Sequence, residues 1–140
     1  MSIGYGGRRL RDLIESLRGE GVDLLVDVRL SPRSGIPGFS GAALKRSLGE
    51  AGIDYRHEPS LGNPVDNRAG FQDGARDARV RFRRILESSG RVALVWLTGT
   101  ARVRRVAVLC AERDEDRCHR KEIIAAATLI NPRLVVTNLG

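Results

Sequence analysis

Side chains with chemical potential gather in one short segment of the chain. Cys110, Glu112, Cys118 and His119 all fall in the run Cys110-Ala-Glu-Arg-Asp-Glu-Asp-Arg-Cys-His-Arg120. Thiols act as nucleophiles, redox partners or metal ligands, and carboxylates and imidazoles exchange protons. The segment therefore predicts a functional site, and these four residues are its catalytic candidates.

The residues around Cys118 also suit an anion. A helix that begins there presents free backbone N–H groups and the positive end of its dipole, and Arg120 adds a guanidinium. The same position favours the thiolate form of Cys118, which makes that thiol more reactive. A half-buried, unreactive cysteine is the alternative interpretation.

The cysteine pair has two further interpretations. Cys110, Cys118 and His119 are three potential soft ligands, with His57 as a fourth, and a tetrahedral zinc site needs about that number. Common zinc modules use two close pairs of ligands, and this spacing does not match them, so no metal residue is assigned from the sequence. A reversible disulfide, or a redox or metal sensor built on the two cysteines, stays an open alternative.

The apolar pattern predicts an α/β domain around these residues. Residues 24–28 and 105–109 are continuous apolar runs of strand length, as expected for central strands of a parallel sheet covered on both faces. Shorter strands are predicted over 3–5, 53–57 and 134–137. Helices are predicted over 10–17, 40–51 with Ser40 as N-cap, 75–89 and 122–130. The expected fold is one Rossmann-like three-layer domain over 1–140, with a mostly parallel sheet of about five strands.

Polar residues follow most of the predicted strands. Ligands of open parallel sheets bind at the carboxyl ends of the strands, so these residues are the ligand-binding candidates. They are Gly4, Tyr5, Gly6, Asp27, Arg29, Arg33, His57 and Arg120. The run Gly4-Tyr-Gly-Gly7 resembles a phosphate-cradling turn, although it lacks the three-glycine spacing of a dinucleotide-binding turn.

Composition limits the class of partner. The chain has 140 residues and no apolar stretch near the roughly 20 residues of a membrane span, and its start has no signal-like pattern, so a soluble cytoplasmic protein without a membrane partner is expected. The net charge is +7, and all but two of the 24 Lys and Arg residues are arginine. This excess suits a phosphate-bearing partner, and equally a biased genome or a thermophilic source.

Two enzyme families with a cysteine after an apolar strand are rivals for this chain. The run Leu25-Val-Asp-Val-Arg29 and the later Cys110 resemble rhodaneses and tyrosine phosphatases. Phosphatases place an arginine six positions after the cysteine, but Asp116 occupies that position here. Acidic residues in this loop would repel phosphate or thiosulfate, which argues against both families.

The chain resembles the family catalogued as domain of unknown function 488. The motifs that carry the resemblance run in the family's order over nearly the whole chain. They are Ile3-Gly-Tyr-Gly-Gly7, Leu24-Leu-Val-Asp-Val-Arg29 with Ser31-Pro-Arg33, Ile36-Pro-Gly-Phe39, Gly52-Ile-Asp-Tyr-Arg-His57 with Leu61-Gly62, and the segment from Cys110 to Arg120. The resemblance implies a Rossmann-like three-layer fold and a shared polar site, and no reaction.

The resemblance to this family also indicates whether one ambiguous segment is a helix or a strand. Residues 92–98 have the composition of a buried strand but also fit helical spacing. The resemblance implies a helix over 91–102, and the short link to the next strand could not easily join two adjacent parallel strands. The long segment 58–74 is expected to be a lid or disordered, and its part from 63 to 73 is shorter than the family leads us to expect.

Three functions are compatible with these residues. The first is an enzyme or binding protein for an anionic ligand, phosphate-bearing or nucleotide-like, in which Arg29, Arg33 and Arg120 bind the anion, Glu112 or His119 exchanges protons, and a cysteine is nucleophile or redox partner. The second is a nucleic-acid-binding module without catalysis. Its basic surface would comprise Arg76, Arg79, Arg83 and residues 102–105. The third is the cysteine-pair sensor, and no cofactor or oligomeric state is identified.

Overall fold

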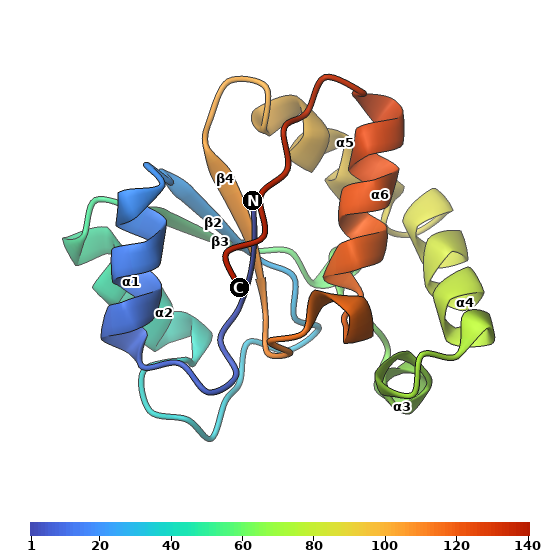
Figure 1. The fold of residues 1–140 in the computed structure, drawn as a ribbon, viewed down its shortest axis with the longest axis horizontal. Coiled ribbons are helices and arrows are strands. Elements are labelled where there is room, and N and C mark those ends of the chain that lie inside the picture. The colour runs from blue at the N-terminus through green and yellow to red at the C-terminus, as the bar shows by residue number, and fades with distance from the viewer.

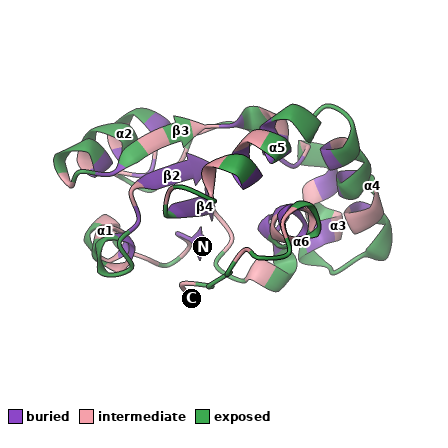
Figure 2. Ribbon diagram, turned by 90° about the horizontal axis from the view of Figure 1, so that it is seen from above, coloured by how far each residue is buried: buried purple, intermediate pink, exposed green.

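Two fully buried strands form the centre of the fold in the computed structural model, which describes residues 1–140. They are β2 (Leu24–Asp27) and β4 (Val106–Cys110), and every residue in both is buried. β1 (Ser2–Gly4) pairs with β4, and β3 (Asp54–His57) pairs with β2. All pairings are parallel, and the strand order is β1-β4-β2-β3. Figure 2 shows β2 and β4 enclosed by the flanking helices.

Helices cover both faces of this sheet (Figure 1). One face carries α1 (Leu10–Gly19) and α2 (Gly41–Glu50), and the other carries α5 (Arg91–Thr100) and α6 (Arg120–Ile130). Outside α6 lie α3 (Arg68–Gln72) and α4 (Arg76–Glu87). The result is a three-layer α/β arrangement, as the sequence predicts.

Alternating strand residues supply two separate cores. Leu25 and Leu109 pack with Leu13 of α1, whereas their sequence neighbours Val26 and Val108 belong to the core beneath α4, α5 and α6. Successive side chains of a strand point to opposite faces, so a strand covered on both faces is apolar along most of its length, with Asp27 at the end of β2 as the charged exception. This explains why the two central strands are the clearest signals in the sequence.

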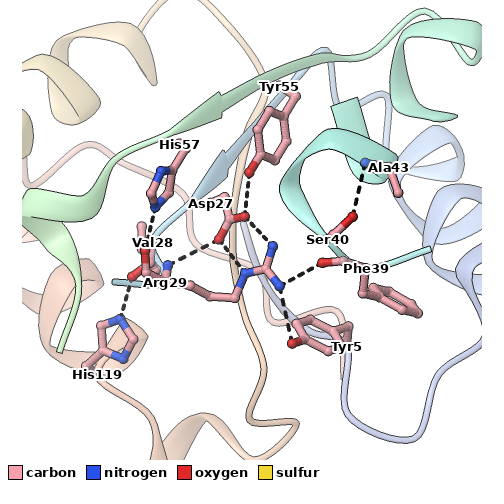
Figure 3. A network of polar contacts seen from close by, with 10 residues as sticks. All are labelled: Tyr5, Asp27, Val28, Arg29, Phe39, Ser40, Ala43, Tyr55, His57 and His119. Carbon is pink, nitrogen blue, oxygen red and sulfur yellow. Dashed lines mark hydrogen bonds and ion pairs between the residues drawn. The ribbon is translucent and has the colours of Figure 1, made fainter. Parts of the chain in front are cut away.

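The structure has four strands, so the expectation of about five was one too many. Residues 134–137 do not form a strand, and the C-terminal segment joins the sheet only through an isolated bridge between Ser2 and Asn138. Val135 is 90% exposed, so its apolar side chain gains little from pairing there. The helix over 91–100 is confirmed, and the Ser40 side chain caps α2 by accepting from the Ala43 amide (Figure 3).

The segment between β3 and α4 is folded. It contains two 3-10 turns, Pro59–Leu61 and Val65–Asn67, before α3. Asn67 is buried, and its side-chain amide donates to the Asn63 side chain and to the Ala78 carbonyl. The segment is therefore packed against α4 and holds α3 in place. None of the helices in the structure has the length and apolar character required to cross a membrane.

The arginine row of α4 is tied to α6. Arg79 and Arg83 contact the two oxygens of the Glu122 carboxylate at 3.0 and 2.6 Å. The Glu122 side chain is only 5% exposed. Burial acts to raise the pKa of Glu122, but the hydrogen bonds and charges of Arg83 and Arg79 outweigh it, so the pKa is lowered. This pairing joins the outer helix to the layer beneath it.

Replacing Glu122 by glutamine is expected to lower the free energy of unfolding by about 1–3 kcal/mol at neutral pH, because two arginines lose a charged acceptor. A carboxyl whose pKa is lowered by folding stabilises the protein above its ordinary pKa, and that contribution disappears as the pH falls through the folded-state value. The difference between variant and parent should therefore shrink below pH 4.5, the ordinary value for this group.

Urea unfolding at several pH values measures this difference. Glu50→Gln, at the exposed end of α2, is the matched control and should change the free energy of unfolding by less than about 0.5 kcal/mol. A difference for Glu122→Gln that did not depend on pH would contradict an ionic contribution.

Candidate functional site

The strand register brings the carboxyl ends of all four strands to one edge of the sheet. Gly4 is level with Cys110, and Asp27 is level with both Leu109 and His57. The helices after β1 and β2 cover one face, while α6, which follows β4, covers the other. Connections that diverge in this way leave a crevice at the strand ends, which is the usual place for a ligand in such sheets.

The four catalytic candidates converge at this crevice. Cys110, Glu112, Cys118 and His119 each contribute one potential ligand atom, and these four atoms all lie within 4.8 Å of one another. The Cys110 thiol is 2.8 Å from a Glu112 carboxylate oxygen, and that oxygen is 3.5 Å from the Cys118 sulfur. Both cysteines are free and buried. We call these four residues the Cys-Glu-Cys-His cluster.

His119 is held in one orientation by a backbone carbonyl. Its Nε2 atom lies 2.9 Å from the Val28 carbonyl oxygen (Figure 3). A carbonyl oxygen only accepts hydrogen bonds, so Nε2 carries a proton and Nδ1 faces the cluster. Nδ1 is 3.9 Å from the Cys110 sulfur and 3.8 Å from the Cys118 sulfur. The Phe82 ring packs edge-on against the imidazole and completes its surroundings.

The two thiols have different proton affinities. The hydrogen bond with Cys118, together with burial and the Glu112 charge, raises the pKa of the Cys110 thiol. Burial also opposes ionisation of Cys118, but hydrogen bonds from Cys110 and His119 and the charge of Arg120 outweigh it, and its pKa is lowered. Burial acts to lower the pKa of His119, but its contact with Cys118 reverses this effect. Cys118 is therefore the more acidic thiol of the pair.

Arg120 supports the cluster from inside the protein. Its side chain is fully buried, although the sequence placed it among the residues that contact an anion. The guanidinium donates to the Cys118 sulfur at 3.3 Å, to the Ser2 hydroxyl at 2.9 Å and to the Glu112 carbonyl at 2.6 Å. Its hydrogen bonds are thus made within the protein, and they fix Cys118 relative to β1.

A second buried arginine fixes the end of β2. Arg29 makes a two-pronged contact with the Asp27 carboxylate, at 2.8 and 2.6 Å, and donates to the Phe39 carbonyl at 2.7 Å (Figure 3). The Tyr5 hydroxyl lies 3.3 Å from the same guanidinium, and the Tyr55 hydroxyl donates to Asp27 at 2.6 Å. Burial acts to lower the pKa of Arg29, but the contacts with Asp27 outweigh it and the net shift is upward. Burial and the bond to Asp27 both raise the pKa of Tyr55.

This arrangement sets the position of both histidines. The Arg29 carbonyl lies 2.7 Å from Nε2 of His57, and the preceding Val28 carbonyl accepts the hydrogen bond from Nε2 of His119 (Figure 3). His57 therefore lies beside the cluster without being part of it. The ion pair of Asp27 and Arg29 supports the imidazole of His119 through the backbone.

A small pocket opens beside the cluster. Its volume is about 100 Å³. The lining residues are Tyr5, Arg29, Leu30, Ser31, Arg33, Asn63, Arg68, Cys110, Ala111, Glu112 and His119. Arg33 and Arg68 are in the lining, and neither has a salt bridge to a carboxylate. The pocket thus presents two free positive charges next to Cys110 and His119.

Five of these lining residues were not among the candidates from the sequence: Leu30, Ser31, Asn63, Arg68 and Ala111. Asn63 and Arg68 come from the segment between β3 and α4, which no strand end predicts. Their positions depend on how α3 packs, and the sequence pattern does not encode that packing directly. A larger hollow of about 460 Å³ between α5, α6 and the C-terminal segment is mostly apolar, and none of the cluster residues lines it.

The glycines after β1 allow a close approach of two backbones. A Cβ atom on Gly4 would lie 1.9 Å from the Glu112 carbonyl oxygen, and one on Gly6 would lie 2.9 Å from the Ala111 carbonyl oxygen. The Gly6 amide donates to that Ala111 oxygen at 2.9 Å. The glycine run resembled a phosphate-cradling turn, but here it makes room for the loop that carries Glu112.

Replacing Asp27 by asparagine is expected to cost about 3–5 kcal/mol of unfolding free energy, because it leaves the Arg29 charge buried without its partner. Tyr55→Phe removes one hydrogen bond to the same carboxylate and should cost less, about 1.5–3 kcal/mol. Asp54→Asn changes an exposed aspartate of β3 and should cost about 1 kcal/mol or less. Urea unfolding measures all three, and equal losses for Asp27→Asn and Asp54→Asn would contradict the proposed importance of the buried pair.

Gly4→Ala is expected to destabilise the protein by about 1–3 kcal/mol or more, since the added methyl group must displace backbone. Gly49→Ala is the matched control, because a Cβ on this α2 glycine meets nothing within 4 Å. That change should be neutral or stabilise by up to about 1 kcal/mol. Thermal or urea unfolding measures the stability of both variants. A Gly4→Ala protein as stable as the parent would show that the two backbones are not in close contact.

Comparison with known proteins adds one assignment. The model of the family described as Domain of unknown function DUF488 matches residues 9–127, which is most of the chain. The chain therefore belongs to this family, in agreement with the motifs in its sequence. No curated protein and no solved structure matches it.

Proposed function

We propose that this member of the DUF488 family binds a small anion, or the phosphate-like end of a larger ligand, in the pocket beside the Cys-Glu-Cys-His cluster. The observation that carries the proposal is the presence of Arg33 and Arg68 in the pocket lining without carboxylate partners. A guanidinium offers a planar set of donors that matches the oxygens of phosphate, sulfate or carboxylate.

The size of the pocket limits the ligand. With a volume of about 100 Å³, the pocket is much smaller than the roughly 300–1,000 Å³ typical of sites that enclose a drug-sized ligand, so a group such as phosphate or sulfate suits it. A nucleotide would therefore place a phosphate inside and leave its sugar and base outside. The charges of the lining also favour an anion, because Arg29, Arg33 and Arg68 line the pocket against one carboxylate, that of Glu112. Asp114 and Asp116 of the neighbouring loop contact Arg117 and Lys121 and do not line the pocket.

The cluster would act on the bound anion. Cys110, Glu112 and His119 line the pocket, whereas Cys118 is not part of its lining. A ligand held by the two arginines would lie near the Cys110 sulfur and within reach of the Glu112 carboxylate, which exchanges protons. We therefore propose an enzyme in which Arg33 and Arg68 bind the substrate and the cluster performs the chemistry.

The alternative of a nucleic-acid-binding module receives less support from the same side chains. Arg79 and Arg83 of α4 are paired with Glu122, and Arg104 is paired with Asp23 and Asp54. Nucleic acid binds best where several unpaired basic groups neutralise successive phosphates. These arginines mainly serve the protein's own carboxylates.

Titration calorimetry with inorganic phosphate and with sulfate tests the proposal. Arg68→Gln and Arg33→Gln should each weaken binding about tenfold or more, the loss expected when a charged hydrogen bond of about 1.5–3 kcal/mol is removed. Arg46→Gln, on the exposed side of α2, removes the same charge away from the pocket and should leave binding nearly unchanged. Equal weakening in all three variants, or no binding by the parent protein, would refute the proposed site.

A further inference from the structure

We propose that the Cys-Glu-Cys-His cluster binds a divalent cation of the zinc class. This inference goes beyond the anion pocket and does not depend on it, since none of the four cluster residues is one of the two pocket arginines. The observation that points to a metal is the convergence of two sulfurs, an imidazole nitrogen and a carboxylate oxygen within 4.8 Å. These are the atom types that bind zinc in proteins.

The spacing of the four atoms fits a tetrahedral ion. Zinc–sulfur bonds of about 2.3 Å and zinc–nitrogen or zinc–oxygen bonds of about 2.0–2.2 Å imply distances of about 3.5–3.8 Å between neighbouring ligand atoms. Nδ1 of His119 lies 3.9 and 3.8 Å from the two sulfurs, and the Cys118 sulfur lies 3.5 Å from the Glu112 oxygen. The 2.8 Å contact between Cys110 and Glu112 must open, and ligand atoms that lie up to 4.8 Å apart must move closer. Glu112 is the least buried of the four and has the most room to move.

The groups around the cluster are those that a metal site requires. A histidine ligand needs its second ring nitrogen fixed by an acceptor, and the Val28 carbonyl does this for His119 at 2.9 Å. The Arg120 guanidinium donates to the Cys118 sulfur, as outer groups do to metal-bound thiolates. Two thiolates, one carboxylate, Arg120 and a divalent cation together sum to zero charge, so the buried site would be electrically balanced.

The ligands differ in exposure, and this difference suggests how the metal would be used. Cys110, Cys118 and His119 are buried, whereas Glu112 is half-buried and lines the anion pocket. Two cysteines and one histidine with an exchangeable fourth ligand form a set found in catalytic zinc sites. The two thiolates favour zinc-class ions over Mg²⁺ or Ca²⁺, which prefer oxygen. The exchangeable position would face the pocket.

Titration of the reduced, chelator-treated protein with Co²⁺ under anaerobic conditions tests the proposal. Co²⁺ in a tetrahedral site with thiolate ligands has characteristic visible bands and a thiolate charge-transfer band. We expect these bands to saturate at one equivalent and to disappear when one equivalent of Zn²⁺ is added. Mg²⁺ in large excess should not displace the cobalt.

Matched variants locate the ion. His119→Gln and Glu112→Gln are compared with His57→Gln and Glu115→Gln, which make the same changes outside the cluster. Cys110→Ser and Cys118→Ser should each reduce the charge-transfer band by about half or more, the double variant should abolish it, and His119→Gln should weaken Co²⁺ binding at least about tenfold. Glu112→Gln should keep the band but change the visible spectrum, since only the exchangeable ligand is altered.

The outcomes separate this proposal from the anion site. Absence of the bands in the parent protein, or bands unchanged in Cys118→Ser, would overturn the metal site whatever the phosphate titration gives. Far-ultraviolet circular dichroism identifies variants that fail to fold. If His119→Gln does not fold, the parent protein's X-ray absorption spectrum decides, because the proposal requires two sulfur ligands and at least one imidazole around bound Zn²⁺.

Discussion

The buried guanidinium of Arg120 is the interaction on which the site depends. A charged side chain without solvent exposure is stable only if its donors find acceptors inside the protein. Those acceptors come from two segments that lie far apart in the sequence: Ser2 in β1, and the loop between β4 and α6, which supplies the Glu112 carbonyl and the Cys118 sulfur. A single side chain thus holds the elements that bring the cluster together. The close backbone approach at Gly4 occurs at the same Glu112 carbonyl, so the geometry of this edge leaves little freedom.

The second buried arginine has a parallel role on the neighbouring strand. Arg29 is held by Asp27, and the backbone that follows Asp27 presents its carbonyls to His119 and His57. Lysine could not replace either residue, because only a guanidinium offers several donors in one rigid plane. Some of the many arginines therefore stabilise the fold and need no binding partner to explain them. Net charge alone is thus weak evidence for nucleic-acid binding.

The fold could be predicted wherever a segment is buried on both sides. The apolar runs of β2 and β4 identify central parallel strands, and periodic apolar residues identify α1, α2, α4 and α6. Composition alone did not identify α5 as a helix, because the segment from Val92 to Thr98 is as apolar as a buried strand. The resemblance to the family predicted the helix, and the structure confirms it. In the C-terminal segment the composition predicted a strand that does not form. The β-branched residues there have no layer to pack against, and the segment makes only one bridge to the sheet.

The site could be predicted only as far as strand ends determine it. Cys110, Asp27, His57 and Gly4 follow from the rule that parallel strands end at one edge, and Cys118 and His119 follow from the start of the next helix. Arg68 and Asn63 depend on the packing of α3, which no local pattern encodes. The spacing of possible metal ligands was also uninformative, because a strand end and a helix start supply them here rather than two close pairs.

Glu112 links the two halves of the site. Its carboxylate touches both sulfurs of the cluster and also lines the pocket that holds Arg33 and Arg68. Asp114 and Asp116 of this loop pair with Arg117 and Lys121, and Glu115 accepts from the Asn138 side chain, so Glu112 is the carboxylate that lines the pocket. A cation in the cluster would neutralise this carboxylate and place its own charge next to the arginines. Occupation of the cluster and affinity of the pocket for anions must then be coupled, because both depend on the same carboxylate.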